Sequence, residues 1–397
     1  MNNINSFEQE WERTLNTIVN RNKTLISLDY FIQLAKDNIL INKIKSDKPK
    51  VVMIGYLFPE EIIRALNIDF CYVFGGSYQS TKFDNNLPKD TDDTALSIFG
   101  LLNGDCIVLN NEDIILFPLY NDDMKKMCSL LENKATVIPY EVPSYKEDKL
   151  QEKRYVYEIQ RVTKELEKHF NKKLSIKTLK KECALSKKAT EFFNRFEDLF
   201  KERNVISSSA FMLIANSYHF CKNKDEWTNN INNLINEINN TDNVFKHKNN
   251  IMVFGSPIYA PEYKPIFSLE DLNLKIYTII HPDIAHIKYG KYYELDSISI
   301  ENLSKKYLEL DISPTFINNN RTYYIVDKTI KKRIIDGVIA FVLRDQIEYD
   351  YQFNYIERLI VDNKVPLNRI ETVYGNDDIE HLKLRLDAFF EMINIKK

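Results

Sequence analysis

Cysteine, glycine and proline are all scarce in this sequence, at 5, 9 and 12 of 397 residues. No two cysteines stand at the C-x-x-C spacing of zinc ribbons and redox pairs, and their odd number argues against a disulfide framework. Each cysteine is therefore expected to be a small buried apolar residue. The few glycines form no G-x-G-x-x-G fingerprint, Walker A loop or G-x-S-x-G elbow, so the usual dinucleotide, P-loop and hydrolase signatures are absent.

Strong charge of one sign and long apolar runs are also missing. The 54 basic and 57 acidic residues leave a formal net charge of -3, whereas a nucleic-acid surface needs a clustered basic excess. No run of about 18 uncharged apolar residues occurs, so no membrane span is expected, and the acidic start of the chain is unlike a signal peptide. The sequence therefore predicts a soluble cytoplasmic protein that binds neither nucleic acid nor membrane.

Strand and helix patterns alternate in the first part of the chain. Residues 50–55 read KVVMIG, a short apolar run suited to a strand buried on both faces. Pro59 then indicates a helix start, and a second apolar run at 70–74 ends at Gly75 and Gly76. Such strand–helix–strand units give parallel strands. Further strands are predicted at 106–109, 114–118 and 136–139, with helices at 94–102 and 124–131.

A long helical region without glycine or proline follows, and strand–helix alternation then resumes. Helical spacing runs from residue 151 to about 237, and strands are predicted at 251–254, 274–280, 337–343 and 369–373. The predicted fold class is α/β, with two tandem doubly wound, Rossmann-like parallel-sheet domains and a helical insert. We expect an N-terminal helical segment at 1–45, a first α/β domain at 46–150, a helical region at 151–245 and a second α/β domain at 246–397.

Candidate ligand-binding residues follow from strand position. In open parallel sheets, ligands bind beyond the carboxyl ends of the strands, close to helix N-termini. The residues that follow the predicted strands in this way are Tyr56, Gly75, Gly76, Asn121, Asp122, Ser256 and Arg344.

Glu60 and Glu61 are the paired carboxylates at such a strand end, and they are the candidate catalytic residues. A desolvated carboxyl has a raised pKa and can act as a general acid or base. The competing interpretation is that they stabilise the positive end of a helix dipole, and the residues alone favour it. His281 and His286 lack a third partner, so they are expected to be exposed loop residues rather than metal ligands.

Several segments together resemble the D-component of 2-hydroxyacyl-CoA dehydratases, a family that also contains benzoyl-CoA reductase subunits. Residues 55–65 (GYLFPEEIIRA) resemble the family's opening strand and P-E-E-I-I helix, and Gly75-Gly76 follow at the expected distance. Residues 251–257 resemble its second G-S/T-P loop, and residues 336–339 (DGVI) its last core strand. Residues 365–391 resemble its terminus, so the similarity spans about 45 to 393.

The resemblance implies a subunit with an iron–sulfur cluster in the cleft between two Rossmann-like domains. Three cysteines would hold a [4Fe–4S] cluster, a homologous subunit would be the partner, and an ATP-dependent activator would deliver one electron. The resulting ketyl radical anion would expel the 2-hydroxyl group of an acyl-CoA. If active, the chain would therefore act as a lyase of the (R)-2-hydroxyacyl-CoA dehydratase type.

The cluster-ligand positions of the family carry no cysteine in this chain. The first falls within residues 87–93 (LPKDTDD), the second at Asn121-Asp122 and the third at Arg344-Asp345. Iron–sulfur clusters need thiolate ligands, and Arg344 adds a fixed positive charge. Cys106 and Cys128 flank the second position but are not expected to replace the lost ligands.

Three functions remain open at this point. The leading hypothesis is a cluster-free subunit that works with a homologous dehydratase-like subunit or with a second copy of itself, and without a cofactor in this chain. The alternative is a repurposed protein that binds an acyl-CoA or another small molecule without redox activity. A non-redox enzyme that uses Glu60 or Glu61 as acid or base is the third.

Overall fold

The computed structural model describes residues 2–43, 48–83, 87–88, 90–104, 106–132, 135–247, 249–289 and 297–395, and it contains two four-stranded parallel sheets. Lys89, within the first expected cluster-ligand segment, lies outside the described residues. The predicted fold class of two tandem doubly wound α/β domains is confirmed. The strands are β1 (Lys50–Ile54), β2 (Asp69–Val73), β3 (Ile114–Leu119), β4 (Thr136–Glu141), β5 (Asn249–Gly255), β6 (Leu274–Ile280), β7 (Gly337–Leu343) and β8 (Leu367–Thr372).

Helices occupy most of the remaining chain, and none of those described is long and apolar enough to cross a membrane. In the first half they are α1 (Asn2–Arg21), α2 (Leu28–Lys43), α3 (Glu60–Ala65), the short η1 (Ser80–Lys82), α4 (Asp93–Asn103), α5 (Asp122–Leu131), α6 (Lys149–His169) and α7 (Ile176–Glu202). In the second half they are α8 (Ser208–Phe220), α9 (Lys224–Asn240), α10 (Lys264–Asp271), α11 (Pro282–Tyr289), α12 (Ile300–Leu310), α13 (Asn320–Lys331), α14 (Ile347–Asp362) and α15 (Ile379–Ile395).

The first sheet has the order β2-β1-β3-β4 and is covered on both faces. Alternate residues of β1 face opposite sides: Val52 and Ile54 pack with α4 and α5, whereas Val51 and Met53 pack with α3, α6 and α12. All five residues of β1 are buried, which explains the continuous apolar run in the sequence. The chain reverses its winding between β1 and β3, so the switch point of this sheet lies there.

The second sheet repeats the arrangement with the order β6-β5-β7-β8. Ile251 and Val253 of β5 pack with α10 and α15, whereas Met252 and Phe254 pack with α13 and α14. Its switch point lies between β5 and β7. The two sheets are therefore built on the same plan.

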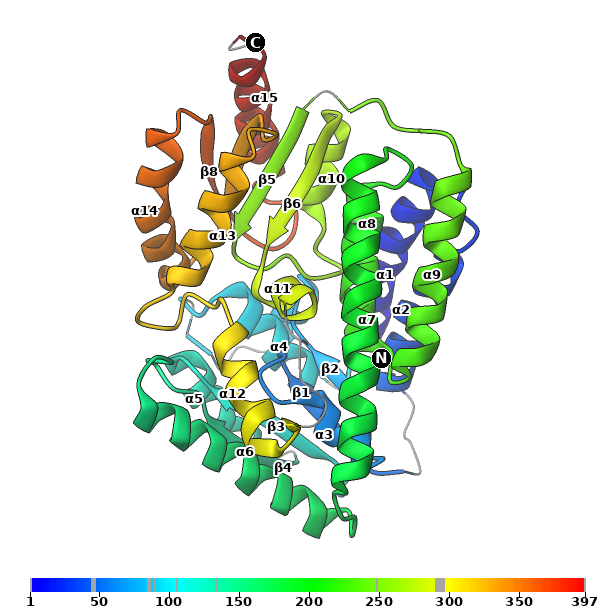
Figure 1. The fold of residues 1–397 in the computed structure, drawn as a ribbon, viewed down its shortest axis with the longest axis vertical. Helices are drawn as coiled ribbons and strands as arrows, with labels where there is room; N and C mark the ends of the chain where they lie inside the picture. The colour runs from blue at the N-terminus through cyan, green and yellow to red at the C-terminus, as the bar shows by residue number, and fades with distance from the viewer. Residues whose placement is uncertain are drawn as a thin grey trace.

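A column of helices runs along both sheets and joins them. In Figure 1, α7, α8 and α9 stand beside the two sheets together with α1 and α2 from the start of the chain. Helix α7 has 27 residues and so spans about 40 Å, and it contacts α3 of the first domain as well as α11 and β6 of the second. Helix α6 lies outside this column and packs against β4 and α12.

One predicted strand is wrong: residues 106–109 form a loop. A turn at Asn110–Asp113, in which the Asp113 amide donates to the Asn110 carbonyl at 3.0 Å, separates this apolar run from β3. The Asp113 carboxylate accepts from the Lys50 amide at 2.9 Å, at the start of β1. Strand β3 therefore joins the sheet only after the turn. Cys106 lies in the loop before the turn, and its side chain packs into the core.

Gly76 allows the two domains to approach each other closely. It has a φ of +85°, and a Cβ there would lie 2.7 Å from the carbonyl oxygens of Tyr259 and Ala260 in the second domain. Its own carbonyl accepts from the Glu262 amide at 2.9 Å. A glycine is needed because both the left-handed φ and the space exclude a side chain.

We predict that Gly76→Ala lowers the free energy of unfolding by about 3 kcal/mol or more, because strain and a backbone clash add together. Gly55→Ala is the matched control: φ is +65° but no atom lies within 4 Å of its Cβ, so a loss of only about 1 kcal/mol is expected. Urea denaturation of both variants measures the difference. Equal losses would show that the approach of the domains does not depend on Gly76.

Candidate functional site

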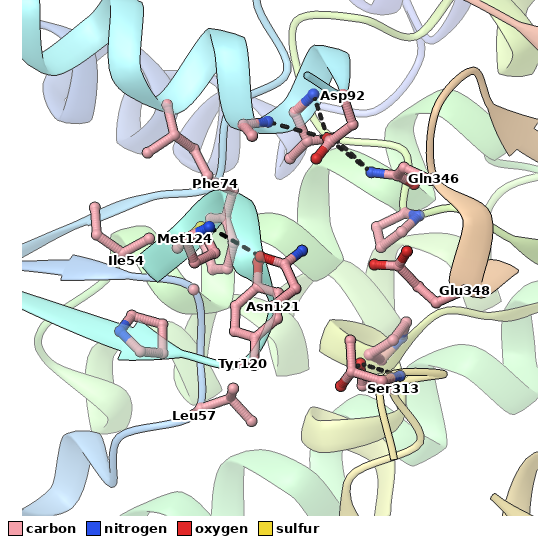
Figure 2. A pocket seen from close by; sticks show the side chains of 18 of the residues that line it. Ile54, Leu57, Phe74, Asp92, Tyr120, Asn121, Met124, Ser313, Gln346 and Glu348 are labelled. Atoms are coloured by element: carbon pink, nitrogen blue, oxygen red, sulfur yellow. Dashed lines mark hydrogen bonds between the residues drawn. The ribbon is translucent and has the colours of Figure 1, made fainter. Parts of the chain in front are cut away.

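The switch points of the two sheets face each other across one cavity. Its first-domain lining includes Gly55 and Tyr56 after β1, and Tyr120 and Asn121 after β3. Pro257 follows β5 in the second-domain lining. Ligands of doubly wound folds bind at such points, so this cavity is the candidate functional site (Figure 2).

The first-domain wall is built around the N-termini of two helices. Asp92 is the N-cap of α4, and its Oδ1 accepts from the amides of Thr94 at 2.9 Å and Ala95 at 3.1 Å. Asn121 is the N-cap of α5 and accepts from the Met124 amide at 2.9 Å. Short polar side chains at these positions satisfy amides that the helix itself leaves unpaired.

The second-domain wall is built by the segment that follows β7. The Gln346 side-chain amide crosses the cavity and donates to Asp92 Oδ1 at 3.0 Å. Glu348 lines the same space, and Figure 2 shows its carboxylate directed toward the first domain. The space between the walls measures about 90 Å³, room for roughly six to nine water-sized groups.

Burial raises the pKa of the carboxyl groups in this cavity. The pKa of Asp92 rises to about 6, because burial penalises the charged form and the nearby carboxylates of Glu348 and Asp123 add repulsion. The pKa of Glu348 is also raised, mainly by burial. Asp311 does not line the cavity but accepts from the Tyr56 hydroxyl at 3.2 Å, and burial raises its pKa to about 6. The cavity thus holds two carboxyl groups, Asp92 and Glu348, whose charged forms are disfavoured by burial.

Of the candidate ligand-binding residues, Tyr56 and Asn121 line this cavity. The other candidate ligand-binding residues do not line the cavity. Gly75 and Gly76 shape the backbone beside α4 and the second domain, and Ser256 is buried, with its hydroxyl accepting from the Leu343 amide at 2.9 Å. The Asp122 and Arg344 side chains are 94% and 60% exposed.

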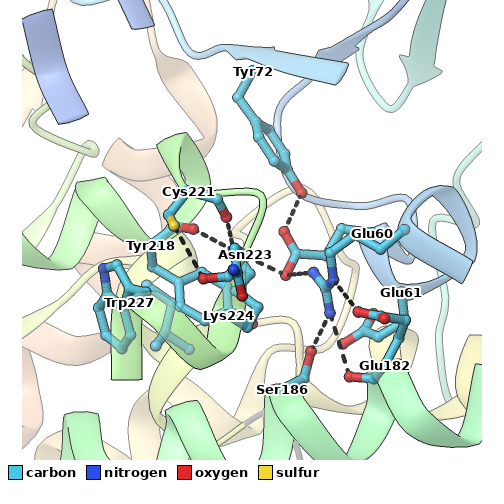
Figure 3. A network of polar contacts seen from close by, with 12 residues as sticks. Glu60, Glu61, Tyr72, Glu182, Ser186, Tyr218, Cys221, Asn223, Lys224 and Trp227 are labelled. Atoms are coloured by element: carbon cyan, nitrogen blue, oxygen red, sulfur yellow. Dashed lines mark hydrogen bonds and ion pairs between the residues drawn. The ribbon is translucent and has the colours of Figure 1, made fainter. Parts of the chain in front are cut away.

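Glu60 and Glu61 do not line the cavity but lie in a buried polar network (Figure 3). Glu60 pairs with Arg64 at 2.6 Å and Lys224 at 3.4 Å, and accepts from the Tyr72 hydroxyl at 2.9 Å. Glu61 accepts from the Tyr307 hydroxyl at 2.6 Å. Their catalytic role remains a prediction, while these contacts are those of a network that joins α3 to α9 and α12.

A second, open groove lies at the opposite end of the first sheet. Its lining includes Pro49 before β1, Asp69 at the start of β2 and Glu112 before β3, together with several lysines. These positions are the amino ends of the strands, where doubly wound sheets do not usually bind ligands. The groove therefore ranks behind the cavity at the switch points.

The expectation that His281 and His286 are exposed is wrong. Both are buried, with exposed fractions of 0% and 3%, because they stand at the end of β6 and on α11, which pack under the cavity. The His286 ring lies 5.4 Å from that of Tyr56 and 4.4 Å from that of Tyr307. Burial lowers the pKa of His281 to about 3, so its ring is neutral.

Among the cavity residues that the sequence did not single out are Asp92, Tyr120, Gln346 and Glu348. Asp92 lies in the segment that the family resemblance gave for the first cluster ligand, whereas Tyr120, Gln346 and Glu348 lie close to positions selected by the strand-end rule. It gave no means to tell which side chain of a segment faces inward, because that depends on the turn after each strand. At β7 the turn places Asp345 at a φ of +69°, after which Gln346 and Glu348 face the cavity and Arg344 faces solvent.

Comparison with known families gives one match. The profile of the 2-hydroxyglutaryl-CoA dehydratase D-component covers residues 56–393, nearly the whole chain. The chain belongs to this family. The resemblance drawn from the sequence motifs is thereby confirmed. No curated protein matches the chain significantly.

The donor atoms that line the cavity between the two sheets do not fit a [4Fe–4S] cluster. No cysteine lines it, and all five cysteines are buried elsewhere, at Cys71, Cys106, Cys128, Cys183 and Cys221. Burial raises the pKa of the Cys71 thiol to about 11 and also raises that of Cys128, which disfavours the thiolate that a cluster needs. In the described part of the chain, no group of three or more His, Cys, Asp or Glu side chains is arranged to hold a metal ion.

We predict that Asp92→Asn stabilises the protein at neutral pH by about 1 to 3 kcal/mol. The asparagine retains a capping oxygen but removes a buried charge. Because the folded pKa of Asp92 is raised from 3.8 to about 6, the wild type loses stability as pH rises through this window and the variant does not. Urea denaturation between pH 3.5 and 8 measures the gap, which should open from about pH 4 to 6. A stability difference between variant and wild type that does not change with pH would contradict the raised pKa of Asp92.

We predict that Arg64→Met lowers the free energy of unfolding by about 3 kcal/mol or more. The arginine is 4% exposed and pairs with Glu60 and Glu182, so its removal leaves buried carboxylates poorly compensated. Arg344→Met is the matched control, since that side chain is 60% exposed and lies 3.5 Å from Glu371, and a change within about 0.5 kcal/mol is expected. Similar values for both variants, measured by urea denaturation, would argue against a structural role for the network.

Proposed function

We propose that this chain is a cluster-free subunit of a 2-hydroxyacyl-CoA dehydratase-like or acyl-CoA reductase-like complex. The observation that carries the proposal is the lining of the cavity between the two sheets. By the resemblance, the family places its cluster ligands at three segments; here the first two contribute Asp92 and Asn121 to the cavity, and Gln346 follows directly after the third. Carboxylate and amide side chains do not supply the thiolates of an iron–sulfur cluster.

The hydrogen bonds across the cavity support the same proposal. Asp92 and Gln346 join the two domains directly at 3.0 Å. A second bond runs from the Tyr374 amide to the Asp93 carboxylate at 2.6 Å. These contacts fasten the two domains at the place where the family's cluster would otherwise lie between them.

D-components of this family work with partner subunits. We propose a homologous, cysteine-containing subunit as the partner, with a second copy of this chain as the other candidate. Under this proposal, lyase chemistry and the ATP-dependent activator act on the partner's cluster. The chain described here supplies a folded, redox-inactive half of the complex.

We predict that anaerobic iron–sulfur reconstitution of the purified chain leaves it without stoichiometric iron. Iron is measured per chain after desalting, with the visible absorption of a cluster as the second readout. A Cys106→Ser/Cys128→Ser double variant should give the same background as the wild type, because neither thiol faces the cavity. Three or four irons per wild-type chain would overturn the proposal, and their loss in the double variant would identify the ligands.

A further inference from the structure

The charged side chains that line the cavity between the sheets are all acidic. Asp92 and Glu348 line it, whereas no lysine, arginine or histidine stands among its lining residues. Neither carboxylate forms an ion pair with a basic side chain within the described ranges. The strongest charges acting on Asp92 come from Glu348 and Asp123, which are themselves acidic. Asp92 is buried and Glu348 is partly buried. Asp92 Oδ1 accepts from two helix amides and from Gln346, but no cation balances the charge of either carboxylate in the described residues, so the cavity favours a positively charged ligand.

A hydrogen-bond acceptor without a partner also favours a ligand that carries N–H donors. Gln346 is 8% exposed, and its amide nitrogen donates to Asp92 Oδ1 and to Thr94 Oγ1 at 3.2 Å. These two acceptors fix the orientation of the amide, since the flipped form would set its oxygen against the carboxylate. The Oε1 atom is buried and has no hydrogen-bond partner among the described residues. A buried acceptor of this kind is satisfied by an N–H or O–H donor from ordered water or from a ligand.

Aromatic rings also line the cavity. Tyr120, Tyr259 and Tyr349 line the cavity together with Phe74. The rings of Phe74 and Tyr259 stack across the two domains with centroids 5.0 Å apart. Aromatic faces attract cations through their quadrupole, and more strongly where water is excluded.

We propose that this cavity binds a small organic ammonium ion with N–H donors. The ammonium group lies between Asp92 and Glu348 and donates to Gln346 Oε1, and its short alkyl part contacts the tyrosine rings. The cavity volume of about 90 Å³ admits roughly five to nine non-hydrogen atoms. The combination of carboxylates, an orphaned acceptor and aromatic walls selects an amine over an anion of the same length.

The inference is independent of the proposed function, because it rests on the side chains that line the cavity and not on the absence of a cluster. A metal ion is the less suitable cation. The described residues offer no cluster of three suitable ligands, and aromatic walls do not coordinate hard cations. The phosphates of a CoA thioester would meet two acidic and no basic side chains among the residues that line this cavity.

Three probes of equal chain length test the proposal on the full chain: n-butylammonium chloride, sodium butyrate and 1-butanol. Thermal unfolding is followed at fixed ionic strength over a concentration series at pH 7.5. We expect butylammonium to raise the Tm in a saturable way, while butyrate and butanol leave it unchanged. Equal responses to all three probes, or no response to the amine, would overturn the proposal.

A pair of variants on α14 locates the binding. Glu348→Gln removes one of the two carboxylate charges that line the cavity and should weaken butylammonium binding about tenfold or more. Glu357→Gln makes the same change at an exposed position of the same helix and should keep the wild-type affinity. Calorimetric titration of both folded variants gives the comparison, and an equal loss in both would overturn the proposal.

Butyryl-CoA serves as the last probe. If it stabilises the chain and butylammonium does not, the inference fails while the cluster-free subunit proposal stands. If reconstitution loads stoichiometric iron while butylammonium still binds through Glu348, the subunit proposal fails and the inference stands.

Discussion

The structure depends on the sharing of one carboxylate between two domains. Asp92 caps the N-terminus of α4 and at the same time accepts from Gln346, which follows β7 of the other sheet. A single oxygen therefore satisfies backbone amides of the first domain and fixes the position of the second. This arrangement buries the carboxylate, and burial raises the pKa of Asp92 because it penalises the charged form.

This shared carboxylate stands at the place that a doubly wound fold provides for ligands. Both sheets reverse their winding at the cavity, so helix N-termini and strand ends converge there from two sides. The family resemblance implies a cluster at this convergence. Here its side chains bond to one another across the domains, and the remaining space is acidic and aromatic. The same backbone plan thus presents different chemistry, because function is determined by the side chains at the site.

The buried network of Glu60, Arg64 and Lys224 shows a different use of charge. These groups satisfy one another inside the protein, between a short helix of the first domain and the helical column. The P-E-E-I-I segment that identifies the family is therefore, in this chain, a packing element as much as a sequence signature. The cavity carboxylates differ because no basic side chain in the described structure compensates them.

The sequence alone determined the two α/β domains and most of the strand ends that reach the cavity, because apolar strand runs and strand–helix alternation are local properties of the chain. The family followed from the resemblance of its motifs. The sequence also determined that cysteine is absent from the expected ligand positions. Only the tertiary structure decided which side chains face inward. Arg344 turns to solvent and Gln346 to the cavity through one left-handed residue, and Glu60 is paired with residues more than 150 positions away. Such choices depend on contacts between distant segments, which local patterns do not encode.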